Sequence, residues 1–262
     1  MPFTPVHALA VAPLARFRKV LLEAAVLGSL ASDVPLFTAA APHYTLTHSP
    51  RLGVLYTLPY GILAFLWLRW ARGPLISLLP ASARTRLTVF ARTDLPATPL
   101  SWLGWLLAFV VGLYTHIVWD SFTHLQGFGV QQIAILQRAW LQVGLRTLYG
   151  YQVLQHGFGL VGVPILAWVV WRWYRDLRPS TSVIAPAPLY CRVLTSCGLL
   201  LVAPCLALRT AALQSPTWLS EWFAYLLVTH LISIQLVCLG LAALLIRLVA
   251  RPKIWVAGHW QE

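Results

Sequence analysis

The chain has 262 residues, of which 59% are hydrophobic and 10% are charged, and its mean hydropathy is +0.72. A soluble domain carries about a quarter of its residues as charged ones. This composition therefore excludes a soluble monomer and predicts an α-helical integral membrane protein. The basic residues responsible for the net charge of +12 lie between apolar segments, where they orient a membrane protein, so no nucleic-acid partner is expected.

Long apolar runs predict membrane spans near residues 20–33, 52–71, 99–120, 152–171, 190–208 and 222–246. The predicted fold is an all-α polytopic transmembrane bundle of five to six spans plus interfacial helices. We expect a single integral membrane domain over 1–262, with a motif-bearing part at 1–165 and C-terminal spans at 166–262.

The first run is shorter than the others. At 1.5 Å per residue, about fourteen residues reach only about 21 Å, and the run also carries Glu23. A re-entrant helix packed inside the bundle is one alternative to a span. A signal peptide is another, because basic residues precede the run and small residues follow it.

Two connecting segments are predicted to lie on the membrane surface as helices. Residues 74–92 are basic and amphipathic, which favours the cytoplasmic surface, and residues 130–145 are expected on the outer one. With six spans, the basic residues divide fifteen to four between the two sides. This bias predicts that both termini are cytoplasmic. The four cysteines lack metal-ligand spacing and read as small apolar residues.

Two of the seven carboxylates, Asp33 and Asp120, end apolar runs at the predicted outer side. An ionisable group near hydrocarbon costs a few kcal/mol and is a functional candidate by default. His116 and Asp120 are four residues apart and therefore project from one helix face. His124 shares that face if the helix continues to it.

Histidines from two further segments are predicted at the same depth. His48 lies in "LTHSPRLG", where Ser49 can cap the second span and Pro50 can occupy its first turn. His156, in "LQHGFG", opens the fourth span. Imidazole and carboxylate are ligands of zinc and similar divalent metals, and a catalytic site keeps a position open for water. Asp33, His48, His116, Asp120, His124 and His156 therefore predict a metal site.

Simpler explanations exist for each residue taken alone. A histidine at a helix end is most often an interface residue, Asp33 can be a polar stop, and His48 can be the neighbour of a cap. The remaining histidines, His43, His230 and His259, are predicted to be structural.

Several stretches resemble the DUF4184 family of bacterial membrane proteins, over most of the first 165 residues. They are "MPFTPVHALAVAPL", "LGSLASDVPLF", "THSPRLGVLYTLPYGI", "HIVWDSFTH" and "LQHGFGLVG". The family is uncharacterised, so this resemblance implies a fold and a motif set without an activity.

A more distant resemblance is to membrane-bound metal-dependent hydrolases and to the zinc-dependent phospholipase C and P1-nuclease group, which hydrolyse phosphate esters with a metal cluster. It implies that the ligands are His7, Asp33, His48, His116 and Asp120, completed by His124 or His156. The chain departs from that group because it has no N-terminal Trp ligand and no obvious late HxxxE. The charge count places His7 on the opposite side from Asp33. The charge count and the resemblance agree only if residues 5–31 enter the membrane and return to the same side. The basic residues then divide twelve to seven between the two sides.

The expected function is hydrolysis of a phosphate ester, most plausibly in a lipid, at the outer face of a bacterial plasma membrane. The expected cofactor is zinc, with manganese as the alternative, and Asp120 and His124 are the predicted catalytic groups. Arg51 is a candidate for holding an anionic head group, or else an interfacial anchor. Two alternatives stay open: a transporter or channel that uses the same residues as an ion or proton path, and a non-catalytic scaffold.

Overall fold

The structure is a computed structural model that describes residues 4–16, 19–37, 44–91, 95–144, 146–181, 183–215, 217–218 and 220–249. Helices account for nearly all of the regular structure in these ranges, and the strands form one two-stranded hairpin. The prediction of an all-α helical bundle is confirmed. The predictions for His43 and His259 lie outside the described residues.

Five helices among the described residues are long and apolar enough to cross a membrane. They are α4 (Gly53–Leu78), α6 (Pro99–Asp120), α8 (Gly150–Asp176), the continuous helix Leu189–Gln214 and α11 (Glu221–Val249). The fourth consists of α9 (Leu189–Cys197), a π-helical turn η6 (Gly198–Val202) and α10 (Ala203–Gln214). The protein is therefore a membrane protein with transmembrane helices.

The first apolar run forms a short helix instead of a sixth span. It folds as α2 (Lys19–Ala31), which follows η1 (Thr4–His7), α1 (Ala8–Val11) and η2 (Ala12–Arg16). The Thr4 hydroxyl donates a hydrogen bond to Asp33, so the two ends of this helical segment meet. The chain thus turns back on itself between residues 4 and 33, which places His7 near Asp33.

Two predictions about the connecting segments need correction. Residues 130–145 do not form one helix: α7 (Phe128–Gln132) and η5 (Ala134–Gln137) lead into an antiparallel hairpin of β1 (Ala139–Val143) and β2 (Arg146–Tyr149). Gly144 adopts φ 59° at the two-residue turn, a conformation that glycine reaches without strain. In the other segment, α4 continues to Leu78, so that the following helices α5 (Ala81–Leu87) and η4 (Thr88–Phe90) start later than predicted.

The chain divides into two compact units, and α4 belongs partly to each of them. Unit 1 comprises 1–35, 42–65 and 94–176, and unit 2 comprises 36–41, 66–93 and 177–262. The core of unit 1 forms where α2 packs against α6. Gly28 of α2 lies against the backbone of Phe109, and Gly112 of α6 lies against the backbone of Ala25. Small residues at these positions let the two helices approach closely, as is usual in membrane bundles.

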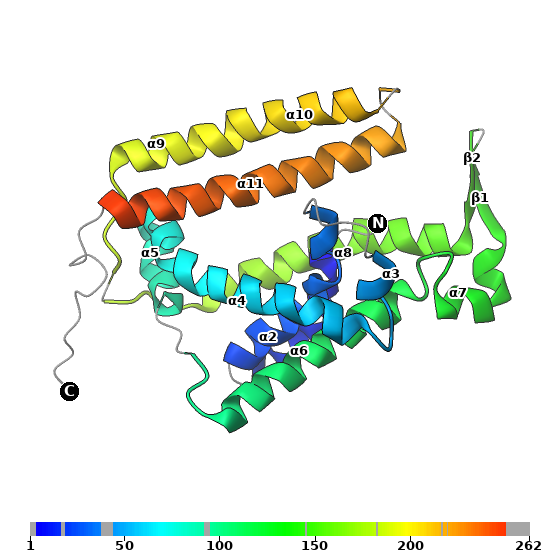
Figure 1. The fold of residues 1–262 in the computed structure, drawn as a ribbon, viewed down its shortest axis with the longest axis horizontal. Helices are drawn as coiled ribbons and strands as arrows, with labels where there is room; N and C mark the ends of the chain where they lie inside the picture. Colours follow the sequence, from blue (N-terminus) through cyan, green and yellow to red (C-terminus); the bar gives the residue numbers. More distant parts are fainter. Residues whose placement is uncertain are drawn as a thin grey trace. The chain divides into compact units, whose positions relative to one another are not determined.

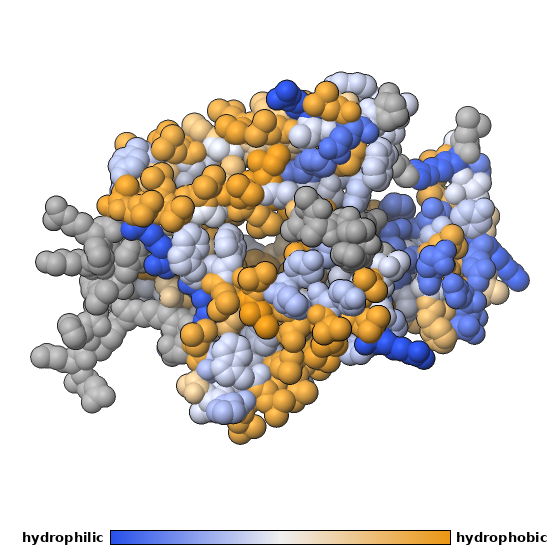
Figure 2. Space-filling model, in the orientation of Figure 1, coloured by the Kyte–Doolittle hydropathy of each residue, from blue (hydrophilic) through white to orange (hydrophobic). Residues whose placement is uncertain are grey.

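Unit 2 is built on an antiparallel pair, α10 and α11, which Figure 1 shows side by side. Ala203, Ala207 and Ala211 recur every fourth residue on α10 and are fully buried, which gives α10 one smooth contact face. Other side chains of this helix, such as Leu206 and Leu213, are exposed. Figure 2 shows hydrophobic side chains over much of the visible surface of α9, α10 and α11, as expected for helices that face lipid.

Candidate metal centre

Helix α6 delivers two of the site residues. Thr98 and Ser101 form a reciprocal capping box at its start, which satisfies backbone N–H groups that have no partner within the helix. The helix ends at Asp120, one turn after His116, and both side chains are buried. His124 follows after one further turn, in which its backbone N–H bonds to the Asp120 carbonyl, so that it stays beside Asp120.

Three other segments complete the cluster. Asp33 is the second residue after the end of α2, and His7 is the last residue of η1. His48 lies between α3 (Tyr44–Thr47) and α4, where the Ser49 hydroxyl accepts a hydrogen bond from the N–H of Leu52. This bond confirms Ser49 as a cap for the turn that leads into α4. All of these residues belong to unit 1.

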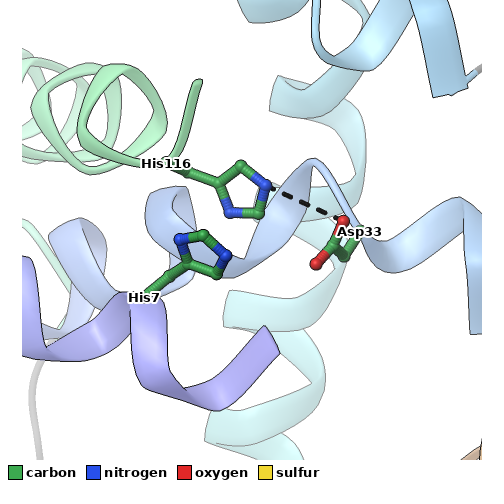
Figure 3. Close-up of side chains that lie close together, drawn as sticks. All are labelled: His7, Asp33 and His116. Carbon is green, nitrogen blue, oxygen red and sulfur yellow. Dashed lines mark ion pairs between the residues drawn. The ribbon is translucent and has the colours of Figure 1, made fainter. Parts of the chain in front are cut away.

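Figure 3 shows the imidazoles of His7 and His116 beside the carboxylate of Asp33. The rings of His7 and His116 are stacked with centroids 3.9 Å apart. Two groups of three residues each offer ligand atoms within 4.8 Å of one another: His7, Asp33 and His116, and His48, His116 and Asp120. His116, which is completely buried, is common to both groups.

The contact of His116 with a backbone carbonyl defines the tautomer of its neutral ring. Its Nδ1 lies 2.7 Å from the backbone carbonyl of Ser29, and a carbonyl can only accept a hydrogen bond. Nδ1 therefore carries the proton, and in the neutral ring Nε2 presents a lone pair. A backbone carbonyl that fixes the tautomer in this way is typical of histidines that bind metals.

Four ligand atoms lie close together, and five of the six distances between them are similar. They are His48 Nε2, His116 Nε2, Asp33 Oδ1 and Asp120 Oδ2. The His48 and His116 atoms are 3.1 Å apart, and the four nitrogen-to-oxygen distances range from 3.3 to 3.7 Å. Ligands placed about 2.0–2.1 Å from a tetrahedral zinc ion lie about 3.3–3.4 Å apart. Five of the six distances between these side-chain atoms are therefore close to the distances between the ligands of a tetrahedral zinc ion.

The second oxygen of each carboxylate has a different environment. Asp33 Oδ2 accepts a hydrogen bond of 2.6 Å from the Thr4 hydroxyl. Asp120 Oδ1 is buried without a hydrogen-bond partner, and lies 3.5 Å from His7 Nε2. His124 Nδ1 lies 3.5 Å from the other oxygen, Oδ2. Asp120 thus stands at the centre of the cluster.

Burial and neighbouring charge set the ionisation of the groups outside the spanning helices. Burial, and then His116, lower the pKa of His7 to about 4, and burial also lowers the pKa of His124. Burial opposes ionisation of Asp33, but a hydrogen bond from His48 and the nearby His116 hold the pKa of its carboxyl below the ordinary value. Burial would lower the pKa of His48, but Asp120 and Asp33 together raise it to about 9.

Two predicted site residues lie elsewhere. His156 is exposed on α8, and no hydrogen bond or ion pair among the described residues joins it to the cluster. Arg51 is also exposed, with its backbone N–H near the Ser49 hydroxyl. His230, predicted to be structural, has its Nδ1 2.8 Å from the Leu226 carbonyl in its own helix.

Sequence reasoning missed Thr4 and the Ser29 carbonyl. A signal for Thr4 was present, because residues three apart lie on the same side of a 3₁₀ helix and "TPVH" places Thr4 three residues before His7. The Ser29 carbonyl has no such signal, since every residue carries one.

The sequence profile of a family described as a domain of unknown function, DUF4184, matches residues 1–252. The chain belongs to the DUF4184 family. The match extends beyond the motif-bearing first 165 residues and includes all five candidate spans. Comparisons with curated proteins and with solved structures gave no match. Membership of DUF4184 thus supplies no activity, and the chemistry has to be argued from the cluster itself.

Proposed function

We propose that the His/Asp cluster binds a divalent metal ion, with zinc as the first choice and manganese as the second, and that the protein is a membrane-bound metal-dependent hydrolase of phosphate esters. The observation that carries the proposal is that five of the six distances among ligand atoms of His48, His116, Asp33 and Asp120 are close to those between the ligands of a tetrahedral zinc ion. The atoms that face one another there are ring nitrogens and carboxylate oxygens, which are the ligands that zinc takes in proteins.

Charge balance supports the same proposal. Among the described residues, every ion-pair partner of Asp33 and Asp120 is a histidine. The pKa values of His7 and His124 are lowered, so these two histidines add little positive charge beside the two buried carboxylates. Buried charges are costly unless they are paired or bind a metal. One divalent cation with neutral histidines would balance both carboxylates.

The proposed roles follow from the positions of the side chains. His48, His116, Asp33 and Asp120 hold the metal, and Thr4 and the Ser29 carbonyl orient Asp33 and His116. When bound, the metal would lower the pKa of a water molecule toward 7 and stabilise charge on phosphoryl oxygens. The side chain of His124 is 24% exposed, compared with 10% or less for the others. His124 therefore lies nearest to an approaching substrate, where it can transfer a proton.

The proposed substrate is a phosphate ester in a lipid. The cluster stands at the ends of α4 and α6, so it lies at the depth where spanning helices meet the polar head groups. Arg51 is exposed three residues after His48, and a guanidinium can hold a phosphate with two hydrogen bonds. The distant resemblance to metal-dependent phosphohydrolases gives the same substrate class.

We place the site at the outer face of a bacterial plasma membrane. With five spans, four basic residues lie toward the side of the cluster: Arg51, Arg138, Arg146 and Arg209. Twelve lie toward the opposite side: Arg69, Arg72, Arg84, Arg86, Arg92, Arg172, Arg175, Arg178, Arg192, Arg247, Arg251 and Lys253. If Arg16, Arg18 and Lys19 are counted on the side of the cluster, that side has seven basic residues and the opposite side still has twelve. Positive residues are retained on the cytoplasmic side, so the cluster faces outward.

Metal analysis of the purified protein tests the metal site. We expect zinc or manganese in stoichiometric amount in the wild type, and its loss in His116→Ala and in Asp120→Asn. His156→Ala is the matched control and should keep its metal, because His156 is exposed outside the cluster. Wild-type protein without metal after incubation with zinc or manganese would refute the proposal.

Hydrolysis is tested separately. The metal-loaded wild type is assayed with a soluble phosphate ester and with phospholipids, beside His124→Gln. We expect His124→Gln to keep its metal and to lose activity by about a hundredfold or more, which is the usual contribution of a positioned acid or base. If the metal-loaded wild type hydrolyses none of these substrates, the hydrolase proposal fails while the metal site stands.

One observation favours a second function, a proton path. His48 lies between two carboxylates that raise its pKa to about 9, as in a proton-transfer network. However, the buried aspartates and histidines among the described residues are all members of this one cluster. A path across the membrane would need further titratable groups. Proton uptake by metal-free vesicles containing the protein, abolished in His48→Ala, would support this second function.

A further inference from the structure

A second site lies in unit 2, between α4 and α9. Side chains from these two helices and from α11 line a cavity of about 360 Å³. Most of the lining is leucine and isoleucine, and Arg72 and Arg192 are also among the lining residues. The cavity thus has mainly hydrocarbon walls, with two basic residues beside them.

One donor of the Arg192 guanidinium is unsatisfied. Its Nε is buried and has no hydrogen-bond partner among the described residues. Arginines near helix ends usually extend to the membrane surface and keep the charge in water, so a buried Nε needs an explanation. A buried donor on a charged group costs about 1–3 kcal/mol or more if it stays unsatisfied, which indicates that a ligand supplies the acceptor.

Arg72 is held in place by backbone carbonyls. Its Nε donates to the Leu68 carbonyl at 3.4 Å, and one terminal nitrogen donates to the Phe90 carbonyl at 3.2 Å. On α9, Ser196 is one turn after Arg192 and also lines the cavity, which adds a hydroxyl on the same helix face.

The sequence of unit 2 offers few carboxylates to neutralise Arg192. Residues 66–93 and 177–262 contain eleven basic residues and two acidic ones, Glu221 and Glu262. Glu221 begins α11, whereas the α11 residue that lines the cavity is Leu239, eighteen residues further along that helix. The cavity therefore favours an anion from outside the protein.

We propose that this cavity binds an anionic phospholipid of the surrounding membrane. The phosphate lies beside Arg192, and the leucine walls hold the first part of an acyl chain. Arg192 is three residues from the start of α9, and Arg72 is six residues from the end of α4, so both are near the head-group level. Basic pockets between transmembrane helices on the cytoplasmic side are a known type of lipid site. This proposal is independent of the metal site in unit 1.

Lipid binding to the purified protein tests the proposal, with phosphatidylglycerol and phosphatidylcholine titrated and bound lipid counted by native mass spectrometry. We expect the wild type to prefer phosphatidylglycerol. Arg192→Met keeps the apolar stem but removes the charge, and should weaken phosphatidylglycerol binding about tenfold or more, as expected for loss of a charged hydrogen bond. Binding of phosphatidylcholine should not change.

Arg209→Met is the matched control, since it removes the same charge from an exposed position on the same continuous helix. Ser196→Trp is a second test that leaves both arginines in place: Ser196 is exposed at the cavity, and the indole should block the lipid. All variants should keep the wild-type metal content. Equal binding of the two lipids by the wild type, or an equal loss in Arg209→Met, would overturn the proposal. Displacement of the lipid by inorganic phosphate would also overturn it, because it would show that the leucine walls contribute nothing.

Discussion

At the scale of single residues, a hydroxyl and a backbone carbonyl hold the candidate ligands in position. The backbone carbonyl of Ser29 accepts a hydrogen bond from Nδ1 of His116, and the Thr4 hydroxyl donates a hydrogen bond to Oδ2 of Asp33. Groups of this kind commonly change metal affinity by about 10–100-fold when they are removed. Since Ser29 acts through its backbone, Thr4 is the contact that mutation can remove.

Thr4→Val should therefore lower metal affinity by about tenfold or more. The substitution keeps the shape of the side chain but leaves a buried carboxylate oxygen without its donor, so the protein should also be less stable by about 1–3 kcal/mol. Competition with a chelator measures the affinity, and thermal unfolding in detergent measures the stability.

Thr57→Val is the matched control, because the Thr57 hydroxyl is also buried but bonds to the carbonyl of Gly53 in its own helix. It should leave metal affinity unchanged. If both variants bind metal like the wild type, Thr4 does not support the site.

A site residue could be predicted when residues close to it in the sequence identified it, and not when its position depends on the tertiary fold. His116 and Asp120 could be placed together from their spacing alone, because both lie on one helix. Asp33 was conspicuous because carboxylates are rare in this chain. His7 was found through the family resemblance, since its place depends on the return of residues 4–33. His156 was wrongly placed in the cluster. It lies on α8, whose residues are apolar on all sides, so the sequence did not show which face of this helix points away from the cluster.

At the scale of secondary-structure elements, the contact between α2 and α6 sets the geometry of the cluster. A Cβ atom at Gly112 would collide with the carbonyl of Ala25, and Gly112 is one turn before His116. Gly112→Ala should therefore separate the two helices and weaken the bond between His116 and Ser29. We expect lower thermal stability and partial loss of metal.

Gly157→Ala is the control for this prediction. Its Cβ meets no atom within 4 Å, so the variant should be neutral or slightly more stable, since alanine favours a helix by about 0.5–1 kcal/mol over glycine. Identical behaviour of Gly112→Ala and Gly157→Ala would show that close packing at Gly112 is not required.

The boundaries of the elements could be predicted where local chemistry ends a helix. The range 99–120 was predicted correctly, because proline suits a first turn and Asp120 ends the apolar run. The segment 130–145 was predicted wrongly, because its apolar residues fit a helical period while the turn at Gly144 produces a hairpin. The first run was too short to classify, and its packing against α6 decided its fold.

At the scale of the whole molecule, the orientation in the membrane can be measured by labelling. With the four native cysteines replaced, Gln126→Cys reports on the turn after the cluster, and Thr181→Cys reports on the loop between α8 and α9. Both positions are exposed. A membrane-impermeant maleimide should label Gln126→Cys in intact bacterial cells and Thr181→Cys only after the cells are opened. The opposite pattern would mean that the cluster faces the cytoplasm.

The return of residues 4–33 also has a consequence for biosynthesis. The first fifty residues supply three candidate ligands, His7, Asp33 and His48, but the first candidate span begins only at Gly53. During translation, these ligands leave the ribosome well before His116 and Asp120, which arrive with α6. The early segment is therefore synthesised before its packing partner α6. If the cluster binds a metal as proposed, the complete set of proposed ligands exists only once α6 has been synthesised.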